Sequence, residues 1–232
     1  MAKRRTSGIQ RRERASAEAL GRRIDERHAS SALPDWRLLL IGGVVVVGIL
    51  ILALVLIFGG GPNPDAGVRN PDDGTIHTAV GADCRDPAQQ NDSTNCGTSP
   101  YSTVPATSGP HWDPSGIANW GVYSTPQPET QVIHNLEHGG IVIWYDPEAV
   151  DADGIDALTS YVNAQVASGI SGRYKFILSP WGGRDELPSP VVATAWLYTL
   201  SLDVPDTDRI DAFARARYGR SPEPNGGPGP PG

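Results

Sequence analysis

A run of 21 uncharged and strongly apolar residues, 38–58, constrains this chain more than any other feature of its sequence. An α-helix needs about 20 such residues to cross the ~30 Å hydrocarbon core of a bilayer. A helix buried in a soluble core would normally keep a polar stripe, and a cleaved signal peptide would have a shorter apolar stretch followed by small residues at a cleavage site. The run therefore predicts an uncleaved signal anchor with a single transmembrane helix.

Charge is divided unevenly between the two sides of this run. Residues 1–37 hold ten of the 19 basic residues and five of the 26 acidic ones, a net charge of +5, so the remainder of the chain carries −12. Because Lys and Arg favour the cytoplasmic side of a membrane, we expect a single-pass cell-membrane protein with a basic cytoplasmic segment over residues 1–37 and the C-terminal domain outside the cell. The acidic remainder argues against nucleic acid as a partner, since a nucleic-acid-binding domain needs a basic face.

Composition divides the part beyond the run into a linker, a domain and a tail. Residues 59–72 are rich in Gly, Pro, Asn and Asp and have no apolar periodicity, which is typical of a linker. Residues 221–232 contain nine Gly or Pro in twelve positions and are expected to be disordered. Residues 73–220 lie between these segments and are numerous enough to bury one hydrophobic core.

Regular patterns are confined to the second half of this domain. β-Branched and aromatic residues, or their alternation with polar ones, predict strands over 141–145, 174–178 and 191–202. Helical spacing and charges that complement the helix dipole predict helices over 151–168 and 206–218. The order β-α-β-β-α, after a loop-rich N-terminal half, predicts a two-layer α+β domain with its helices on one face of a mixed or antiparallel sheet.

The chain has two cysteines, Cys84 and Cys96, and both lie in the loop-rich half. Outside the membrane a disulfide between them would persist, and it would stabilise this short loop by roughly 3 kcal/mol. A redox pair or a soft-metal site is the alternative, although redox pairs are usually closer, as in Cys-x-x-Cys. The spacing favours a structural disulfide.

Three histidines of the domain lie in unusual local sequence. His111 follows a Gly-Pro turn, and His134 and His138 lie just before the predicted strand over 141–145. In a helical turn, the i,i+4 spacing would place both imidazoles on one face, as ligands of one metal require, with Glu137 beside them as a third ligand, an orienting group or a general base. If the fold brings His111 to this pair, three imidazoles and a carboxylate would suit zinc or copper. Alternatively, the histidines bond backbone carbonyls in an aromatic-rich loop.

Four blocks of the sequence together resemble a known family. They are YSTVPATSGPHW (101–112), GVY (121–123), VIHNLEHGG (132–140) and LPSPVVATAW (187–196). In this order they are similar to the bacterial domain of unknown function family 3105, over about residues 73–218. The resemblance implies a membrane-anchored extracytoplasmic domain and implies no activity, because none is assigned to the family. The blocks include His111, His134 and His138.

Three functions are consistent with these patterns. The first is an extracytoplasmic module that binds a transition metal, zinc or copper, through His111, His134 and His138. The second is a small envelope metallohydrolase that uses Glu137 as the base for a metal-bound water. The third is an envelope scaffold or assembly partner that contacts another envelope protein and holds no metal. Convergence of the three imidazoles would favour the first two over the third.

Overall fold

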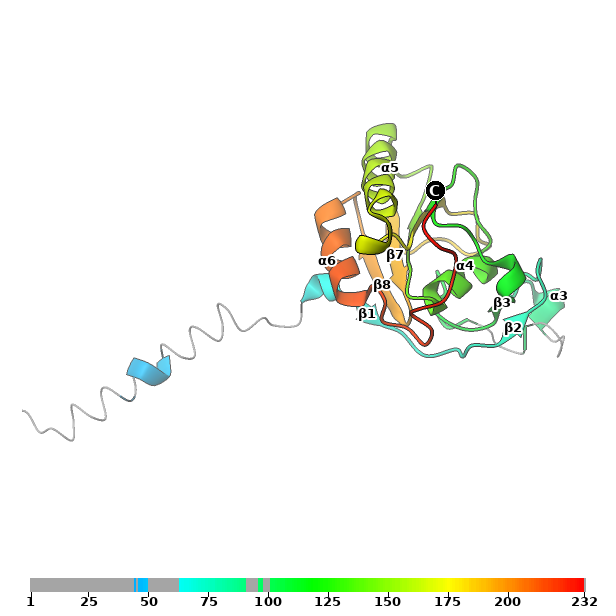
Figure 1. The fold of residues 1–232 in the computed structure, drawn as a ribbon, viewed down its shortest axis with the longest axis horizontal. Helices are drawn as coiled ribbons and strands as arrows, with labels where there is room; N and C mark the ends of the chain where they lie inside the picture. Colours follow the sequence, from blue (N-terminus) through cyan, green and yellow to red (C-terminus); the bar gives the residue numbers. More distant parts are fainter. Residues whose placement is uncertain (1–43, 45, 50–62, 91–95, 98–100, 232) are drawn as a thin grey trace, which may run out of the picture. The chain divides into compact units, whose positions relative to one another are not determined.

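A computed structural model describes part of the chain, in two units. The described residues are 44, 46–49, 63–90, 96–97 and 101–231. The first unit, Met1–Gly61, is described only at residues 44 and 46–49, which are helical. The second unit, Pro62–Gly232, contains the folded domain (Figure 1).

The expected transmembrane helix is not found in the part of the chain that the structure describes, where no helix is both long and apolar enough to cross a membrane. Most of the run 38–58 lies outside the described residues. This finding contradicts the predicted single-pass helix and the cell-membrane location that depended on it.

The domain is built on a mixed sheet of six strands in the order β1-β8-β7-β5-β6-β4. The strands are β1 (Val68–Arg69), β4 (Gly121–Val122), β5 (Ile141–Tyr145), β6 (Phe176–Pro180), β7 (Val191–Ala195) and β8 (Tyr198–Leu202). Strands β4, β6 and β5 are parallel neighbours, and the pairs β5–β7, β7–β8 and β8–β1 are antiparallel. Every residue of β5, β6 and β7 is buried, which requires cover on both faces of the sheet.

Two segments differ locally from the sequence prediction. The expected single strand over 191–202 is a hairpin, because Leu197 adopts a left-handed backbone with φ 61° and Ala195 pairs with Tyr198. Apolar alternation continues through this two-residue turn, so the period alone does not reveal it. Strand β1 lies within the segment expected to be a linker and pairs with β8, so part of that segment belongs to the sheet.

The domain has three layers, whereas the sequence predicted two. Helices α5 (Ala152–Ala167) and α6 (Thr207–Arg217) cover one face of the sheet, and helix α4 (Glu129–Glu137) with the loop-rich half covers the other (Figure 1). Leu158 of α5 and Phe213 of α6 pack in the core on the first face, and Ile133 of α4 packs in the core on the second. The sequence predicted α5 and α6 but not the layer formed by α4, because that layer depends on contacts between distant segments.

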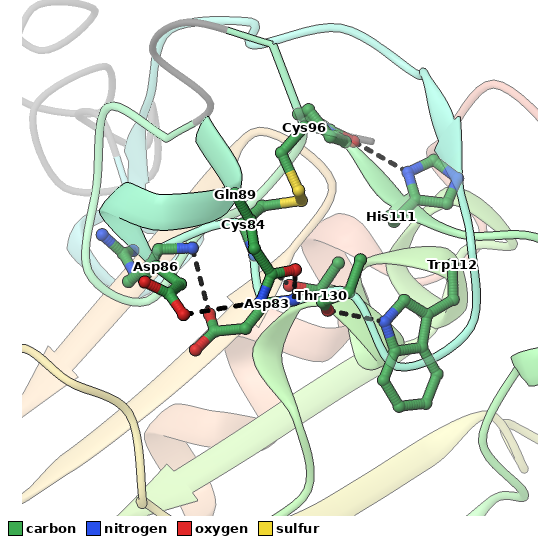
Figure 2. Close-up of a disulfide and its surroundings, with 12 residues drawn as sticks. Asp83, Cys84, Asp86, Gln89, Cys96, His111, Trp112 and Thr130 are labelled. Atoms are coloured by element: carbon green, nitrogen blue, oxygen red, sulfur yellow. Dashed lines mark hydrogen bonds between the residues drawn. A yellow bond between two sulfur atoms is a disulfide. The ribbon is translucent and has the colours of Figure 1, made fainter. Parts of the chain in front are cut away.

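A second, smaller sheet lies in the loop-rich half. It consists of β2 (His77–Thr78) and β3 (His111–Trp112), which run parallel. The short helices of the domain are α3 (Pro87–Gln90) and the 3₁₀ turns η1 (Pro64–Ala66), η2 (Pro114–Gly116) and η3 (Gly169–Ser171). Cys84 and Cys96 form the disulfide that their spacing favours (Figure 2), and together with Ala82 they make a small buried cluster against which Trp112 packs.

Residues 221–231, for which composition predicts disorder, instead lie against the domain. The Trp120 indole N–H donates to the carbonyl of Pro228 at 2.9 Å, and the Lys175 ammonium donates to the carbonyls of Pro224 and Gly226. Gly and Pro bury little apolar surface, which is why their abundance indicates disorder. Here backbone carbonyls supply contacts that composition does not report.

Candidate metal centre

Four side chains with metal-ligand atoms converge at one edge of the loop-rich half. One ligand atom from each of His77, His111, His134 and Glu137 lies within 4.8 Å of the others. His111, His134 and Glu137 are buried, whereas the His77 side chain is 43% exposed. The group therefore has one side open to solvent.

The small parallel sheet brings two of these histidines together. His77 on β2 is in register with His111 on β3, although the two residues are far apart in the sequence. The His111 backbone N–H donates to the Ile76 carbonyl at 2.9 Å, and the imidazole centroids are 4.8 Å apart. Neighbours in register project from the same face of a sheet, so this ladder sets the position of both rings.

Helix α4 supplies the other two members. His134 and Glu137 are at positions i and i+3, a spacing that places them on one helix face. At the other end of the helix, the carboxylate of Glu129 binds Arg85, with Nε–Oε2 at 2.5 Å and Nη2–Oε1 at 2.9 Å. This ion pair ties the start of α4 to the loop beside Cys84.

Hydrogen bonds fix the tautomers of the two buried imidazoles. His111 Nδ1 lies 2.8 Å from the Gly109 carbonyl oxygen, and His134 Nδ1 lies 2.6 Å from that of Trp112. A carbonyl oxygen only accepts, so each Nδ1 carries a hydrogen and donates it. In each neutral ring Nε2 then keeps its lone pair, as in metal-binding histidines oriented by an outer carbonyl.

His111 and Glu137 make the most informative contact of the group. His111 Nε2 is 3.0 Å from Glu137 Oε2, while His111 Nδ1 already donates to Gly109. A neutral imidazole has a single N–H, so it cannot donate to both oxygens. The contact is satisfied by a proton between Nε2 and the carboxylate oxygen, carried by either atom, or by a metal ion that both atoms bind.

The electrostatics favour the metal-binding forms of the α4 residues. Burial, together with the neighbouring histidines, lowers the pKa of His134 to about 4, so this imidazole is neutral at pH 7. Burial raises the pKa of Glu137, but the hydrogen bond with His111 and the nearby histidines outweigh it, and the net pKa is lowered. A neutral imidazole and an ionised carboxylate are the states that bind a metal.

His138, which the sequence predicted as a ligand, is not a member of the converging group. Helix α4 ends at Glu137, and the chain turns through Gly139 at φ 79°. The His138 ring lies beside that of His134, with centroids 4.9 Å apart, but its Nδ1 is 3.0 Å from the Glu223 carbonyl oxygen.

His77 takes the fourth place and was not among the residues predicted from the sequence. The sequence around His77 forms no distinctive motif, and only the pairing of β2 with β3 places this residue beside His111. The structure thus brings together His111, His134 and Glu137 from the predicted set and adds His77. The disulfide cysteines lie outside the group.

Comparison with known proteins gives one match. A family model described as a protein of unknown function (DUF3105) matches residues 93–228, more than half of the chain. The matched range contains His111, His134 and Glu137, and His77 precedes it. Searches of curated proteins and of solved structures gave no match.

Proposed function

The chain belongs to the DUF3105 family of proteins of unknown function, and we propose that its domain binds one transition-metal ion through His77, His111, His134 and Glu137. The observation that carries this proposal is the environment of His111. Both of its ring nitrogens face oxygen acceptors, and a metal ion bound by Nε2 and by the Glu137 carboxylate would satisfy the second contact. Such an ion would also draw His77 and His134 into the same shell.

The ligand set supports zinc or copper(II). Three imidazoles and one carboxylate are ligands that both ions accept, and the group contains no thiolate or thioether that would favour copper(I). Bonds of about 2.0–2.1 Å to a tetrahedral zinc would place the ligand atoms roughly 3.3–3.4 Å apart. The ligand atoms lie within 4.8 Å of one another, so modest side-chain movements would close the shell.

A metallohydrolase is the second candidate, and the exposure of His77 is the observation that favours it. An open side would let water or a substrate reach the metal. In that case Glu137 would act as a base beside a metal-bound water rather than as a ligand. The distance of 3.0 Å between Glu137 and His111 favours the ligand role. The scaffold alternative would present Trp112, Trp120 and Tyr123 to a partner; Trp120 is only 3% exposed, and the other two are partly buried.

The purified full chain tests the proposal directly. We expect it to bind about one equivalent of zinc, and we expect His134→Ala to abolish binding, because that ring supplies a buried ligand on α4. His28→Ala, which removes a histidine outside the proposed ligand set, is the matched control and should bind normally. Metal analysis after dialysis and chelator competition give the stoichiometry and Kd. A chain that binds no zinc or copper, with the same melting temperature with and without metal, would contradict the proposal.

A further inference from the structure

The C-terminal segment 221–231, called the strap below, runs past helix α4 and contains a turn in which the Gly226 N–H donates to the Glu223 carbonyl (Figure 1). Its even-numbered residues from Pro224 to Pro230 are partly buried, and the odd-numbered residues between them are exposed. This alternation indicates that one side of the segment lies against a surface. The strap is therefore seated on the domain along much of its length.

The first contact of the strap is with the C-terminal end of α4. The Glu223 backbone N–H donates to the carbonyl oxygen of Glu137 at 3.1 Å, and the Glu223 carbonyl lies 3.0 Å from His138 Nδ1. The last carbonyls of a helix have no partner within it. The strap supplies one for Glu137, a proposed metal ligand.

The second contact is made through Lys175, just before β6. Its buried ammonium donates to the carbonyls of His138, Pro224 and Gly226 at 2.8–2.9 Å, which uses all three of its donors. Burial lowers the pKa of this ammonium. One side chain thus ties the residue after α4 to two carbonyls of the strap.

The third contact is the ring of His138, which lies between the strap and His134. Its centroid is 4.9 Å from that of His134. Gly226 packs so closely on this ring that a Cβ at position 226 would lie 2.2 Å from its atoms, and a Cβ on Gly227 would lie 3.2 Å from the His138 Cβ. The His138 ring therefore contacts the strap on one side and the ring of His134, a proposed ligand, on the other.

We propose that the strap, with Lys175 and His138, is a positioning element of the metal site. It holds the end of α4 so that His134 and Glu137 meet the histidines of β2 and β3, while the Arg85–Glu129 ion pair holds the start of the helix. The proposal rests on the proposed metal-binding function. Coupling between two sites is reciprocal, so metal binding also holds the strap more firmly on the domain.

Two glycine variants of the full chain form a matched test. Gly226→Ala places a methyl group against the His138 ring, whereas a Cβ on Gly229 has open space within 4 Å. Loss of an outer-shell partner typically weakens metal affinity by about 10–100-fold, and we expect a change of this size for Gly226→Ala. Gly229→Ala is expected to keep the zinc Kd of the unaltered chain. Lys175→Met, which retains the apolar stem and removes the donors, is expected to act like Gly226→Ala.

Two further readouts separate positioning from general destabilisation. The visible spectrum of the Co²⁺-loaded chain reports ligand geometry, and we expect it to change in Gly226→Ala at saturating Co²⁺. Hydrogen exchange at the Glu223 amide should slow when zinc is added to the unaltered chain. An unchanged Kd and Co²⁺ spectrum in both Gly226→Ala and Lys175→Met would overturn the strap proposal alone. Failure of the unaltered chain to bind any metal would overturn the metal site and the strap proposal together.

Discussion

The two faces of the six-stranded sheet bury different kinds of side chain. On the face of α5 and α6 the core is apolar, with Leu158, Ile210 and Phe213 all fully buried. On the face of α4 the apolar residues continue into a layer that also buries His134 and Glu137. Burying polar groups costs free energy unless they are paired, so the second face carries a cost that the first does not.

This difference assigns two roles to the two faces of one small domain. The apolar face, on the side of α5 and α6, contributes to stability through contacts within the folded chain. The polar face, meaning the α4 side with His77, His111, His134 and Glu137, has its ligand atoms within 4.8 Å of one another. We therefore expect changes on the first face to alter unfolding and changes on the second to alter metal affinity.

The largest expected effect is on the apolar face. Phe213→Ala removes a fully buried ring between α6 and the sheet and should lower the free energy of unfolding by about 3–5 kcal/mol. The zinc Kd of the folded variant should stay the same, because the ligands lie on the other face. Urea unfolding and chelator competition measure the two quantities. A weakening of metal binding comparable to that of His134→Ala would show that the two faces are not independent.

Acid should lower the free energy of unfolding of the metal-free chain through His134 and Glu137. The pKa of His134 is about 4 in the folded domain and 6.5 when unperturbed, so the unfolded chain takes up this proton first as pH falls. Stability of the metal-free chain should therefore fall between pH 6.5 and 4, by at most about 1.4 kcal/mol per pH unit from this group. The lowered pKa of Glu137 acts in the same direction at lower pH, because its stabilising charge is lost as the carboxylate is protonated.

Urea midpoints of the metal-free chain across this pH range measure the effect. His134→Gln is the control, and its profile should be flatter between pH 6.5 and 4 because the titrating ring is gone. Identical profiles for the variant and the unaltered chain would rule out His134 as the source of the pH dependence.

A smaller effect should distinguish the two roles considered for Glu137. Glu137→Gln keeps the size of the side chain and removes its charge, so it should weaken zinc binding at least as much as the about 10–100-fold loss of an outer-shell partner. The variant is expected to fold, because the amide can donate to the lone pair of His111 Nε2. Unchanged zinc affinity in this variant would instead support the role of Glu137 as a base.

The sequence predicted the apolar face better than the polar one. Helices α5 and α6 follow from local periodicity, and Asp151 and Asp206 cap them as their positions suggest, each accepting from a backbone N–H three residues on. The runs that form β5 and β6 are also local signals. Burial of β5 on both faces is visible in its unbroken apolar run, but the sequence alone does not identify α4 as its cover.

Prediction of the candidate site was incomplete for a physical reason. His134 was predicted together with His138 from their helical spacing, and Glu137 as the residue beside them, whereas His77 meets His111 only through the pairing of β2 with β3. His138 was predicted as a ligand from the same helical turn, and its ring does lie beside that of His134, but its Nδ1 faces the Glu223 carbonyl and it is not in the converging group. Spacing within one helix can be read from neighbouring residues, whereas the pairing of two strands depends on segments far apart in the sequence.

The central claim concerns which residues form the metal shell, and X-ray absorption at the zinc edge tests it most directly. The zinc-loaded full chain should show about four nitrogen or oxygen ligands at roughly 2.0–2.1 Å, with scattering from three imidazoles. The imidazole count should fall to two in His77→Ala and stay at three in His138→Ala. A count that falls in His138→Ala and is unchanged in His77→Ala would contradict the site described by the structure.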